Sequence, residues 1–259
     1  IEIIEVNGQS DAEFTNDRRI IAGAYDYSLV RSALNSNNWV LMSSELLRPE
    51  VGSYLANVFI ANNMFNLRLH DRLGETQYTD LLTGEKKVTS MWLRHQYGYN
   101  KYKAGNGELA VKNNWNISQL GGDIAQWSSD GQNRLHIGLM AGHGRSENKS
   151  RSVLTNQSSD STVKGYNYGI YGTWYDNDAD KNGLYIDSWA SWSDFDATVS
   201  GKDTSQKYGI KGLTASIESG YSFRSGKLGE FDVWLQPKAQ LTWSDVKADD
   251  YVEDNMTRI

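Results

Sequence analysis

The chain has 259 residues, and its 39% hydrophobic and 22% charged content is too apolar and too varied for a disordered protein. Its formal net charge of -6 comes without a run of basic residues, so nucleic acid is not an expected partner. The absence of Cys excludes disulfides, thiolate metal sites and Cys nucleophiles. The chain is 12% aromatic, with 24 Gly and only 2 Pro, a profile that favours long antiparallel strands.

No stretch approaches the roughly 18 uninterrupted apolar residues of a membrane helix, so the chain is either soluble or crosses a membrane as strands. A basic start followed by an apolar signal segment is missing as well. A secretion pathway can therefore be proposed only if this sequence belongs to a longer precursor.

The first region, residues 1–45, is predicted to contain short strands. Its apolar runs are Ile1–Val6, Arg19–Val30 and Asn38–Met42, and polar turns separate them. We interpret this region as the end of a longer β structure.

The second region, residues 46–83, is predicted to form one helix. Pro49 stands in a helix-start position, apolar residues recur at helical spacing after it, and Gly74 marks the stop. A helix over Glu50–Leu73 would be about 36 Å long, enough to cross the roughly 30 Å core of a bilayer. Because it carries many polar side chains, we expect it in a wet or protein-lined channel and not in lipid.

The third region, residues 84–259, is predicted to form long strands near residues 91–101, 113–127, 134–145, 163–175, 184–196, 209–224 and 231–245. In Phe231–Ser244, apolar and polar residues alternate almost completely, which gives the strand one apolar and one polar face. Strands of roughly 11–16 residues have the length that a tilted membrane strand requires.

Alternation describes a soluble sandwich equally well, so the connections decide between the two folds. We predict long loops near residues 102–112, 146–162 and 197–208, and short turns near 128–133, 176–183 and 225–230. Short turns on one side and long loops on the other are typical of outer-membrane barrels. Aromatic residues near the strand ends fit an interfacial girdle: Trp92, Tyr97, Tyr99, Trp115, Trp127, Tyr166, Trp174, Tyr185, Trp192, Tyr221, Phe231 and Trp243.

Six segments carry a resemblance to a known family. They are Arg48–Glu75, Val88–Arg94, Gln119–Ser128, Tyr171–Asp196, Lys211–Tyr221 and Trp234–Trp243. In this order they resemble monomeric autotransporters of the AIDA-like adhesin branch, and the first resembles the helix-linker signature of that family. The resemblance covers nearly the whole chain.

The resemblance implies an all-β fold: an antiparallel transmembrane β-barrel of twelve strands, about seven to eight of them represented here, with a pore-threading α-helix and a short N-terminal β-helix remnant. Residues 1–45 would be the end of the passenger β-helix, in the autochaperone region. Residues 46–83 would be the linker helix inside the pore, and residues 84–259 the outer-membrane barrel, incomplete at its C-terminus.

The implied function is an outer-membrane translocator that anchors its N-terminal passenger and exports it to the cell surface. The implied partners are outer-membrane lipid, the passenger itself and the barrel assembly machinery.

If the apolar faces contact lipid, alternation directs eight polar residues into the lumen: Arg94, Gln96, Gln119, Asp123, Asp187, Glu218, Gln236 and Lys238. Such a lining can hold a polar helix through hydrogen bonds and ion pairs, and so plug the pore. The helix residues expected to make these contacts are Asn62, Asn63, Asn66, Arg68, His70, Asp71 and Arg72. The alternative is a solvated linker helix that packs outside the lumen.

Asp176, Asp178 and Asp180, with Asp187 at the twelfth place, resemble a calcium loop. The sixth position is Lys181, where the sharp turn of such a loop needs Gly. We interpret the segment as a solvated turn. The four His residues show neither metal-binding spacing nor a nearby nucleophile elbow, so we predict no enzyme, no catalytic residue, no cofactor and no metal.

Asn62 and Asn63 invite comparison with the self-cleaving branch of the family, in which an Asn pair in the helix is cut inside the pore. An Asn amide can attack its own carbonyl when lumen acids such as Asp123 or Glu218 position it. Alignment on the shared Asn66, Arg68 and Asp71 puts the scissile pair at Asn63 and Met64, which lacks the second Asn. We expect no cleavage in the pore.

Two other functions remain open: a surface adhesin that acts through the long loop Glu147–Thr162, and a small-solute porin whose conductance the helix would suppress. The end of the barrel raises a separate question. Seven strands cannot close a twelve-stranded barrel, and an open sheet in lipid leaves two edges of unpaired backbone groups. We expect either that native strands are absent from this sequence, or that a partner such as the assembly machinery's own barrel completes the sheet.

Overall fold

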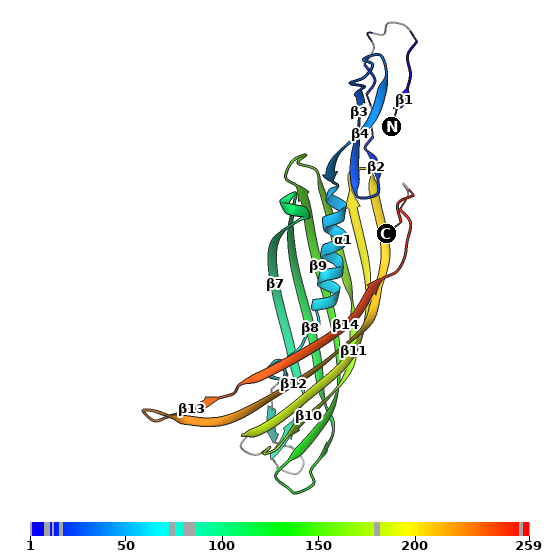
Figure 1. Ribbon diagram of the computed structural model, residues 1–259. Helices are drawn as coiled ribbons and strands as arrows, with labels where there is room; N and C mark the ends of the chain where they lie inside the picture. Colours follow the sequence, from blue (N-terminus) through cyan, green and yellow to red (C-terminus); the bar gives the residue numbers. More distant parts are fainter. Residues whose placement is uncertain are drawn as a thin grey trace.

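In the computed structural model of the chain, residues 2–7, 11, 13–15, 18–72, 76–79, 86–178, 182–253 and 256–258 are described. A tall, curved sheet forms the main wall of the molecule, a helix runs along its concave face, and a small sheet extends beyond one end (Figure 1). The outline is therefore that of a barrel wall with an internal helix.

The wall is an antiparallel eight-stranded sheet in the order β13-β12-β11-β10-β9-β8-β7, with β14 also paired to β12. Its strands are β7 (Trp92–Ala104), β8 (Leu109–Trp127), β9 (Arg134–Ser152), β10 (Ser158–Tyr175), β11 (Gly183–Gly201), β12 (Thr204–Leu228), β13 (Phe231–Leu235) and β14 (Lys238–Ala248). Neighbours in the chain are neighbours in the sheet, as in an up-and-down barrel.

β13 and β14 are two parts of one long strand, because both pair with β12. The break falls at Gln236 and Pro237, and Pro has no backbone N–H for the ladder. Counted in this way, the described wall has the seven strands that the sequence predicts. Figure 1 shows the β12–β13 hairpin projecting away from the rest of the wall.

The predicted long loops are wrong. The strands continue through those segments, and the connections are only residues 105–108, 153–157 and 202–203. The segments looked like loops because both faces are polar there: Ser146, Asn148 and Ser150 are buried on the inner face, while Arg145 and Lys149 are exposed on the outer one. A strand with two polar faces loses its hydrophobic alternation but keeps its backbone ladder, here with β8 and β10.

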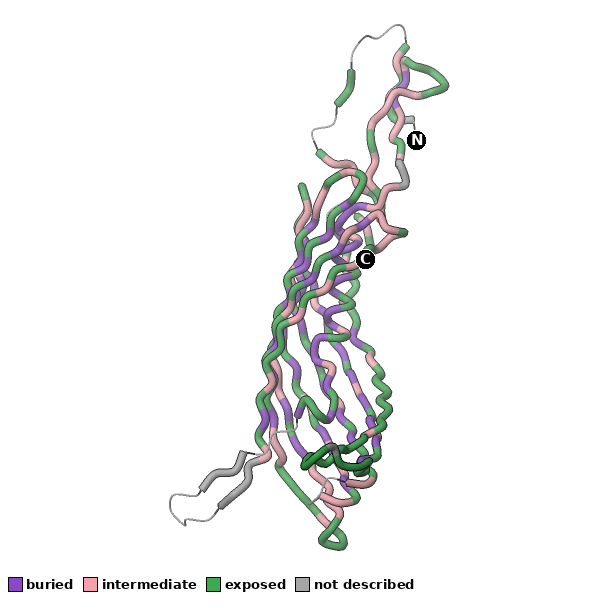
Figure 2. The backbone as a smooth tube through the Cα atoms, turned by 90° about the vertical axis from the view of Figure 1, so that its left-hand side faces the viewer, coloured by how far each residue is buried: buried purple, intermediate pink, exposed green. Residues whose placement is uncertain are grey.

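Burial follows the two-residue period of the strands, and Figure 2 shows buried and exposed residues alternating along the wall. In β11, Tyr185, Asp187 and Trp189 are buried on the inner face, whereas Leu184 and Ile186 are exposed on the outer face. The outer face is thus the apolar one, as expected for strands that contact lipid.

The aromatic girdle is only partly as expected. Eight of the twelve aromatic residues are exposed: Tyr97, Tyr99, Trp127, Tyr166, Trp192, Tyr221, Phe231 and Trp243. Trp92 and Tyr185 instead point inward and are buried. Alternation decides this, because the aromatic residues at even positions of β7 and odd positions of β11 fall on the inner face.

A second antiparallel sheet forms from the N-terminal region, in the order β1-β4-β3-β2. Its strands are β1 (Glu2–Ile4), β2 (Ile20–Ala22), β3 (Tyr25–Arg31) and β4 (Trp39–Leu47). Successive coils of a β-helix pair in parallel, so these strands are antiparallel hairpins and not turns of a β-helix. A further hairpin pairs β5 (Thr76–Thr79) with β6 (Lys86–Thr89).

The helix, α1, spans Pro49–Asn63 and is shorter than the predicted Glu50–Leu73. Pro49 occupies its first turn, where the missing N–H removes no helical hydrogen bond. After Asn63 the chain runs on without regular helix to a single 3-10 turn at Leu69–Asp71. Among the described residues, no helix has the length and apolar character needed to cross a membrane.

The wall does not close within the described residues, because β7 pairs only with β8 and β14 pairs only with β12. Each of these strands therefore presents an unpaired backbone edge. A small complete barrel, which would have contradicted the strand count, is not formed by this part of the chain.

Candidate functional site: the helix and the inner face of the barrel

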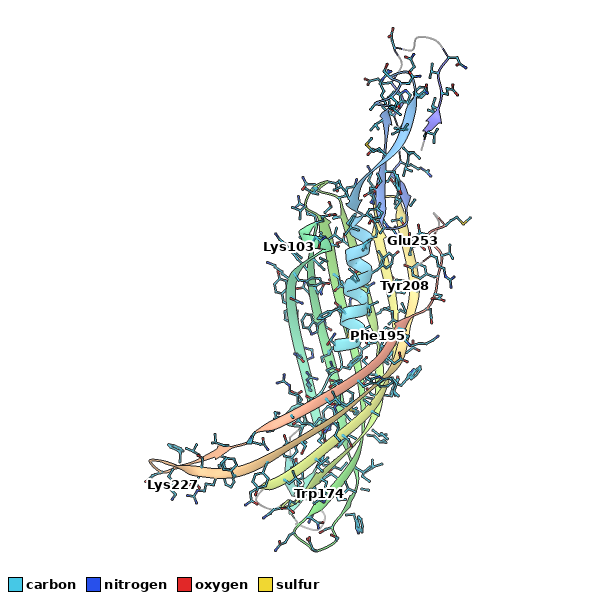
Figure 3. The ribbon with its side chains drawn as sticks, in the orientation of Figure 1. Lys103, Trp174, Phe195, Tyr208, Lys227 and Glu253 are labelled. Atoms are coloured by element: carbon cyan, nitrogen blue, oxygen red, sulfur yellow. The ribbon has the colours of Figure 1, made fainter. Side chains whose placement is uncertain are left out.

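The site is the contact between α1, the segment that follows it, and the inner face of the wall. α1 packs against β8, β9, β10, β11, β12 and β14, and Figure 3 shows Phe195 and Tyr208 beside it. The apolar part of this contact includes Tyr54 and Ile60 of the helix and Met64 directly after it, and Phe65 stacks on Phe195 with ring centroids 5.6 Å apart. The helix is therefore inside the curve of the barrel and not a linker packed elsewhere.

Buried charges fix the start of α1. Glu50 is fully buried and accepts from Arg19 at 2.7 Å, and Arg19 also pairs with Asp26 at 2.8 Å. Burial alone would lower the pKa of Arg19, but the hydrogen bond to Glu50 and the charges of Glu50 and Asp26 raise the pKa above its ordinary value. Glu50 also lies in the first turn, where the helix dipole favours a negative charge.

A second buried ion pair joins Arg48 to Glu253 at 2.7 Å, and Tyr54 donates its hydroxyl to the same carboxylate. Arg48 and Glu253 are 1% and 2% exposed, so water does not screen the pair. The start of the helix is thereby tied to the segment that follows β14.

Asn57 anchors the middle of α1 and is fully buried. Its amide donates to the Tyr208 hydroxyl at 2.8 Å, and its carbonyl accepts from Asn148 at 3.0 Å and Ser161 at 2.8 Å. These three partners lie on three different strands of the wall, β12, β9 and β10. One turn earlier, Ser53 donates to Ser159 at 3.0 Å.

Asn62 and Asn63, the pair compared with the self-cleaving branch of the family, make contacts that are ordinary at the end of a helix. The amide of Asn62 donates to Val58 and Val246 backbone carbonyls at 2.9 and 3.1 Å, and its carbonyl accepts from Ser244 at 2.7 Å. The amide of Asn63 donates to the Phe59 carbonyl at 2.7 Å. In the described hydrogen bonds, no carboxylate contacts either Asn side chain.

Beyond the helix, inner-face side chains hold the backbone of residues 64–68. Arg94 donates to the Asn66 carbonyl at 3.0 Å. The Leu67 carbonyl accepts from Trp189 at 3.1 Å and from Gln240 at 2.7 Å. These donors compensate for the hydrogen bonds that a continued helix would have made.

Arg72 closes the lower end of the contact through a buried ion pair with Asp187. Asp187 also accepts from Thr173 at 2.6 Å, and the Arg72 guanidinium lies 4.4 Å from the centroid of the Tyr171 ring. An ion pair, a hydrogen bond and a cation–π contact together stabilise a charge that would otherwise be costly to bury.

The other polar residues of the predicted lining also lie on the inner face. Gln119 accepts from Arg94 at 2.9 Å, and Gln96 bonds Arg94 as well. Asp123 accepts from Tyr171 at 2.8 Å and contacts His136 at 2.7 Å.

Farther along the wall, Glu218 accepts from Tyr185 at 2.8 Å and from Lys238 at 3.3 Å. Gln236 donates to Ser222 at 2.6 Å. Within the described part of the chain, three residues of the predicted lining form hydrogen bonds to the predicted helix residues: Arg94 to Asn66, Asp187 to Arg72 and Lys238 to His70. The other lining residues form hydrogen bonds within the wall.

Two of the predicted helix residues are exposed to solvent. Arg68 is exposed, and its backbone N–H donates to the Asp71 carboxylate at 2.9 Å. His70 is exposed too, although its ring lies 3.3 Å from the Lys238 ammonium. A cavity of about 500 Å³ remains beside this segment, with Asn63, Asn66 and Arg94 in its lining.

Sequence patterns did not single out Arg48, Glu50, Asn57, Tyr208 or Glu253, which carry much of the contact. The one available signal was Asn57, an amide at the centre of an otherwise apolar helix turn. Glu253 could not be found from pattern, because it is 199 residues away from its partner Tyr54 in the chain.

The acidic turn that resembles a calcium loop contacts basic residues of the neighbouring strand. Asp178 contacts His136 at 3.1 Å and Arg134 at 3.2 Å. Asp180 lies outside the described residues. Within the described parts of the chain, no group of three His, Asp or Glu side chains is arranged to hold a metal ion.

Comparison with known proteins decides the family. The model of the autotransporter β-domain matches residues 91–258, which is the whole of the curved wall. The chain belongs to the autotransporter family. Membership places it in the bacterial outer membrane, and the prediction of an antiparallel transmembrane barrel with an internal helix is confirmed.

Several proteins of Escherichia coli are similar to this chain. The uncharacterized proteins YuaQ and YdeU of strain K12 are 45% and 41% identical to all of this chain, which spans 21% and 62% of their lengths. The autotransporter adhesin AIDA-I is 35% identical over 99% of this chain and 21% of its own length. The chain thus spans less than two thirds of these curated relatives.

A solved autotransporter structure has the same architecture. The crystal structure of the transport unit of AIDA-I from Escherichia coli matches with a TM-score of 0.72 at 32% identity. The match covers 82% of this chain and 66% of that one.

Proposed function

We propose that this chain is the translocator and membrane anchor of its autotransporter, and that α1 with residues 64–72 plugs the lumen after the passenger has passed through it. The observation that carries the proposal is the set of buried hydrogen bonds made by Asn57. An amide fully removed from water is stable only where its partners are already in place. The inner face is thus fitted to this helix.

A disulfide test is direct because the chain has no Cys of its own. The Ser53 and Ser159 hydroxyls are 3.0 Å apart, so the double variant Ser53→Cys/Ser159→Cys has side chains within disulfide range. We expect it to form a disulfide in intact cells while the passenger is displayed on the surface.

The matched control is Ser53→Cys/Ser188→Cys, because Ser188 is exposed on the outer face of β11. It should form no disulfide. A helix outside the lumen would leave the first pair reduced in cells that display the passenger, and that result would reject the plug.

Residues 1–45 would then be the last part of the passenger, and the ion pairs of Arg19 and Arg48 would hold it at the mouth of the barrel. The support is the pair of buried ion pairs to Glu50 and Glu253. This division of the chain, with residues 46–83 as the linker and 84–259 as the barrel, is part of the same proposal.

Lipid and the barrel assembly machinery are the proposed partners besides the passenger. Exposed Leu120, Leu139 and Ile170 form an apolar outer face that supports lipid contact. The unpaired edges of β7 and β14 support pairing with further strands, either of the native protein or of the machinery's own barrel.

The alternative functions have less support. An adhesin that binds through the loop Glu147–Thr162 loses its basis, because Glu147 lies in β9, Thr162 lies in β10 and the turn between them is residues 153–157. A porin would need an open lumen, and α1 occupies it. A non-enzymatic role fits the adhesin and translocator family, and we propose it for this chain.

A further inference from the structure

A basic surface lies on the outer face of the wall, just beyond its aromatic girdle. On β7 the outward aromatic residues Tyr97 and Tyr99 are 67% and 49% exposed, and the next outward residue is Lys101. On β10, Lys164 is the next outward residue after the exposed Tyr166. A basic residue therefore follows the girdle on each of these strands.

The strands between them continue the pattern. On β9, the ring of His143 lies 5.1 Å from that of Tyr166, and the next outward residue is Arg145. We call Lys101, Lys112, Arg145, Lys149 and Lys164 the basic collar; all five are exposed.

The sheet register places like charges directly opposite each other. Lys101 is opposite Lys112, Lys112 is opposite Lys149, and Arg145 is opposite Lys164. Like charges in this position destabilise a sheet. With strands about 4.8 Å apart, the row of three Lys residues spans roughly 10 Å.

Acidic residues lie beside three of the five collar residues, and Lys164 is directly opposite Asp196 of β11. Arg145 pairs with Glu147 at 2.9 Å and Lys149 with Asp160 at 3.6 Å, and all four side chains are more than half exposed. Lys101 and Lys112 have no acidic residue opposite them in the sheet register. On β7, β8 and β9, which are described throughout, Glu147 is the only acid on the outer face, and Lys112 forms no ion pair within the described residues.

Acidic residues interrupt the basic surface at β11. On β11 the outward residues that follow Trp192 are Asp194 and Asp196, which are acidic. The chain as a whole has a net charge of -6, so the basic surface is a local feature and not a consequence of composition.

An apolar hollow lies on the same strands, on the membrane side of the collar. It has a volume of about 680 Å³ and is lined by Leu120 of β8, Leu139 and Ala141 of β9, and Tyr168 and Ile170 of β10, among others. Ala141 and Arg145 are four residues apart in one strand, about 13 Å. Lys149, in the row of three lysines, is eight residues from Ala141 in the same strand, about 26 Å. The surface thus offers an apolar site for an acyl chain and, farther along the same strands, cationic side chains for a headgroup phosphate.

We propose that the basic collar and the apolar hollow together bind a phosphorylated membrane lipid, with its phosphate at the collar and an acyl chain in the hollow. The like-charged rows explain why the ligand is an anion, and the hollow explains why it is a lipid. The proposal rests on the membrane barrel and not on export of the passenger.

The test uses the full-length protein in detergent and native mass spectrometry with phosphatidic acid, which carries a phosphate monoester, or with zwitterionic phosphatidylcholine. The variant is Lys101→Gln/Lys112→Gln. The matched control is Lys207→Gln/Lys211→Gln, two exposed lysines on the outer face of β12.

We expect the collar variant to bind phosphatidic acid about thirty-fold more weakly, since each lysine near a membrane surface contributes about a factor of five. The control should retain its affinity, and phosphatidylcholine should bind weakly to every form. Equal losses in both variants, or equal binding of the two lipids by the parent protein, would overturn the proposal.

Two further measurements separate the sources of the phosphate and the effects of folding. Inorganic phosphate at the lipid's concentration should not displace phosphatidic acid; displacement would mean a soluble-anion site and would reject the lipid. Ala141→Phe, which fills the hollow, should weaken phosphatidic acid binding while all lysines remain. Passenger display should stay at the parent level in each variant, so a failure of lipid binding is distinguishable from a failure of the translocator.

Discussion

At the scale of single residues, Asn57 shows how the barrel recognises its helix. Burying an amide is unfavourable unless its donor and acceptor are both used. Here the partners are Tyr208, Asn148 and Ser161, each from a different strand. The wall therefore supplies a site that fits one helix position, rather than a general polar lining.

Asn57→Leu keeps the size of the side chain but leaves the Tyr208, Asn148 and Ser161 groups without this partner. We expect the free energy of unfolding to fall by about 3 kcal/mol, because each buried group that loses its partner costs on the order of 1 kcal/mol or more. The loss can be followed as a lower temperature for the heat-dependent shift of the folded barrel on a gel.

Asn63→Leu is the matched control on the same helix, because Asn63 is exposed and its side chain bonds the Phe59 carbonyl and, at 3.5 Å, Asn66, but no residue of the wall among the described hydrogen bonds. This change should stay within about 0.5 kcal/mol. Equal shifts in the two variants would show that the Asn57 hydrogen bonds do not stabilise the plug.

The helix end offers a second prediction at this scale. A self-cleaving Asn needs an acid beside it, but Asn62 bonds Ser244 and backbone carbonyls, and Asp123 and Glu218 are engaged by other side chains. We expect mass spectrometry of the purified protein to find the linker intact. A new terminus between Asn62 and Phe65 would contradict this.

Strict alternation was enough to put polar residues on the inner face, because the period of a strand is fixed by its backbone. It could not say which of them touch the helix. Asp187 meets Arg72, whereas Asp123 meets His136 in the wall, and the difference depends on the register and on where α1 ends.

At the scale of elements, the helix is shorter than its sequence pattern predicts because the wall competes for its backbone. Asn62 and Asn63 are poor helix formers. Beyond them, Trp189 and Gln240 donate to the Leu67 carbonyl, so an extended chain loses no hydrogen bonds. The apolar spacing within residues 50–73 contains no information on the donors Trp189 and Gln240, which come from other strands.

The close approach of α1 to β9 occurs at Gly52. A Cβ at this position would lie 3.0 Å from the Ser150 Cβ and 3.3 Å from a Val111 methyl. Gly52→Ala would gain about 1 kcal/mol of helix propensity, but overpacking of this kind costs about 1–3 kcal/mol. We expect a net loss of stability, measured by the same gel shift.

Ser150→Gly should restore part of that stability in the double variant, because it removes the atom that the new methyl group meets. Gly52→Ala alone would raise the unfolding temperature if the helix were a solvated linker. The sign of the change therefore distinguishes a packed helix from a free one.

At the scale of the whole molecule, the number and order of the strands could be predicted, but the height of the wall could not. The hydrophobic pattern reports only the part of a strand that faces lipid, and β9 continues past it to Ser152 with two polar faces. The extended ends of β8 and β9 carry Lys112, Arg145 and Lys149 beyond the girdle. The segments that looked like binding loops are instead mostly the ends of strands in the barrel wall.

The filled lumen leads to the last prediction, which concerns conductance. α1 contacts β8, β9, β10, β11, β12 and β14, and Arg72 is paired with Asp187 beyond its end. A cavity of about 500 Å³ remains beside residues 63–71. We expect the full-length protein in a planar bilayer to conduct weakly. Deletion of Glu50–Leu73 should produce a large, steady conductance, because the lining that remains is polar and hydrated. Arg72→Ala, which leaves α1 in place, is the control and should raise conductance only slightly. A high conductance in the undeleted protein would favour the porin, and equal conductance with and without the segment would mean that the helix does not plug the barrel.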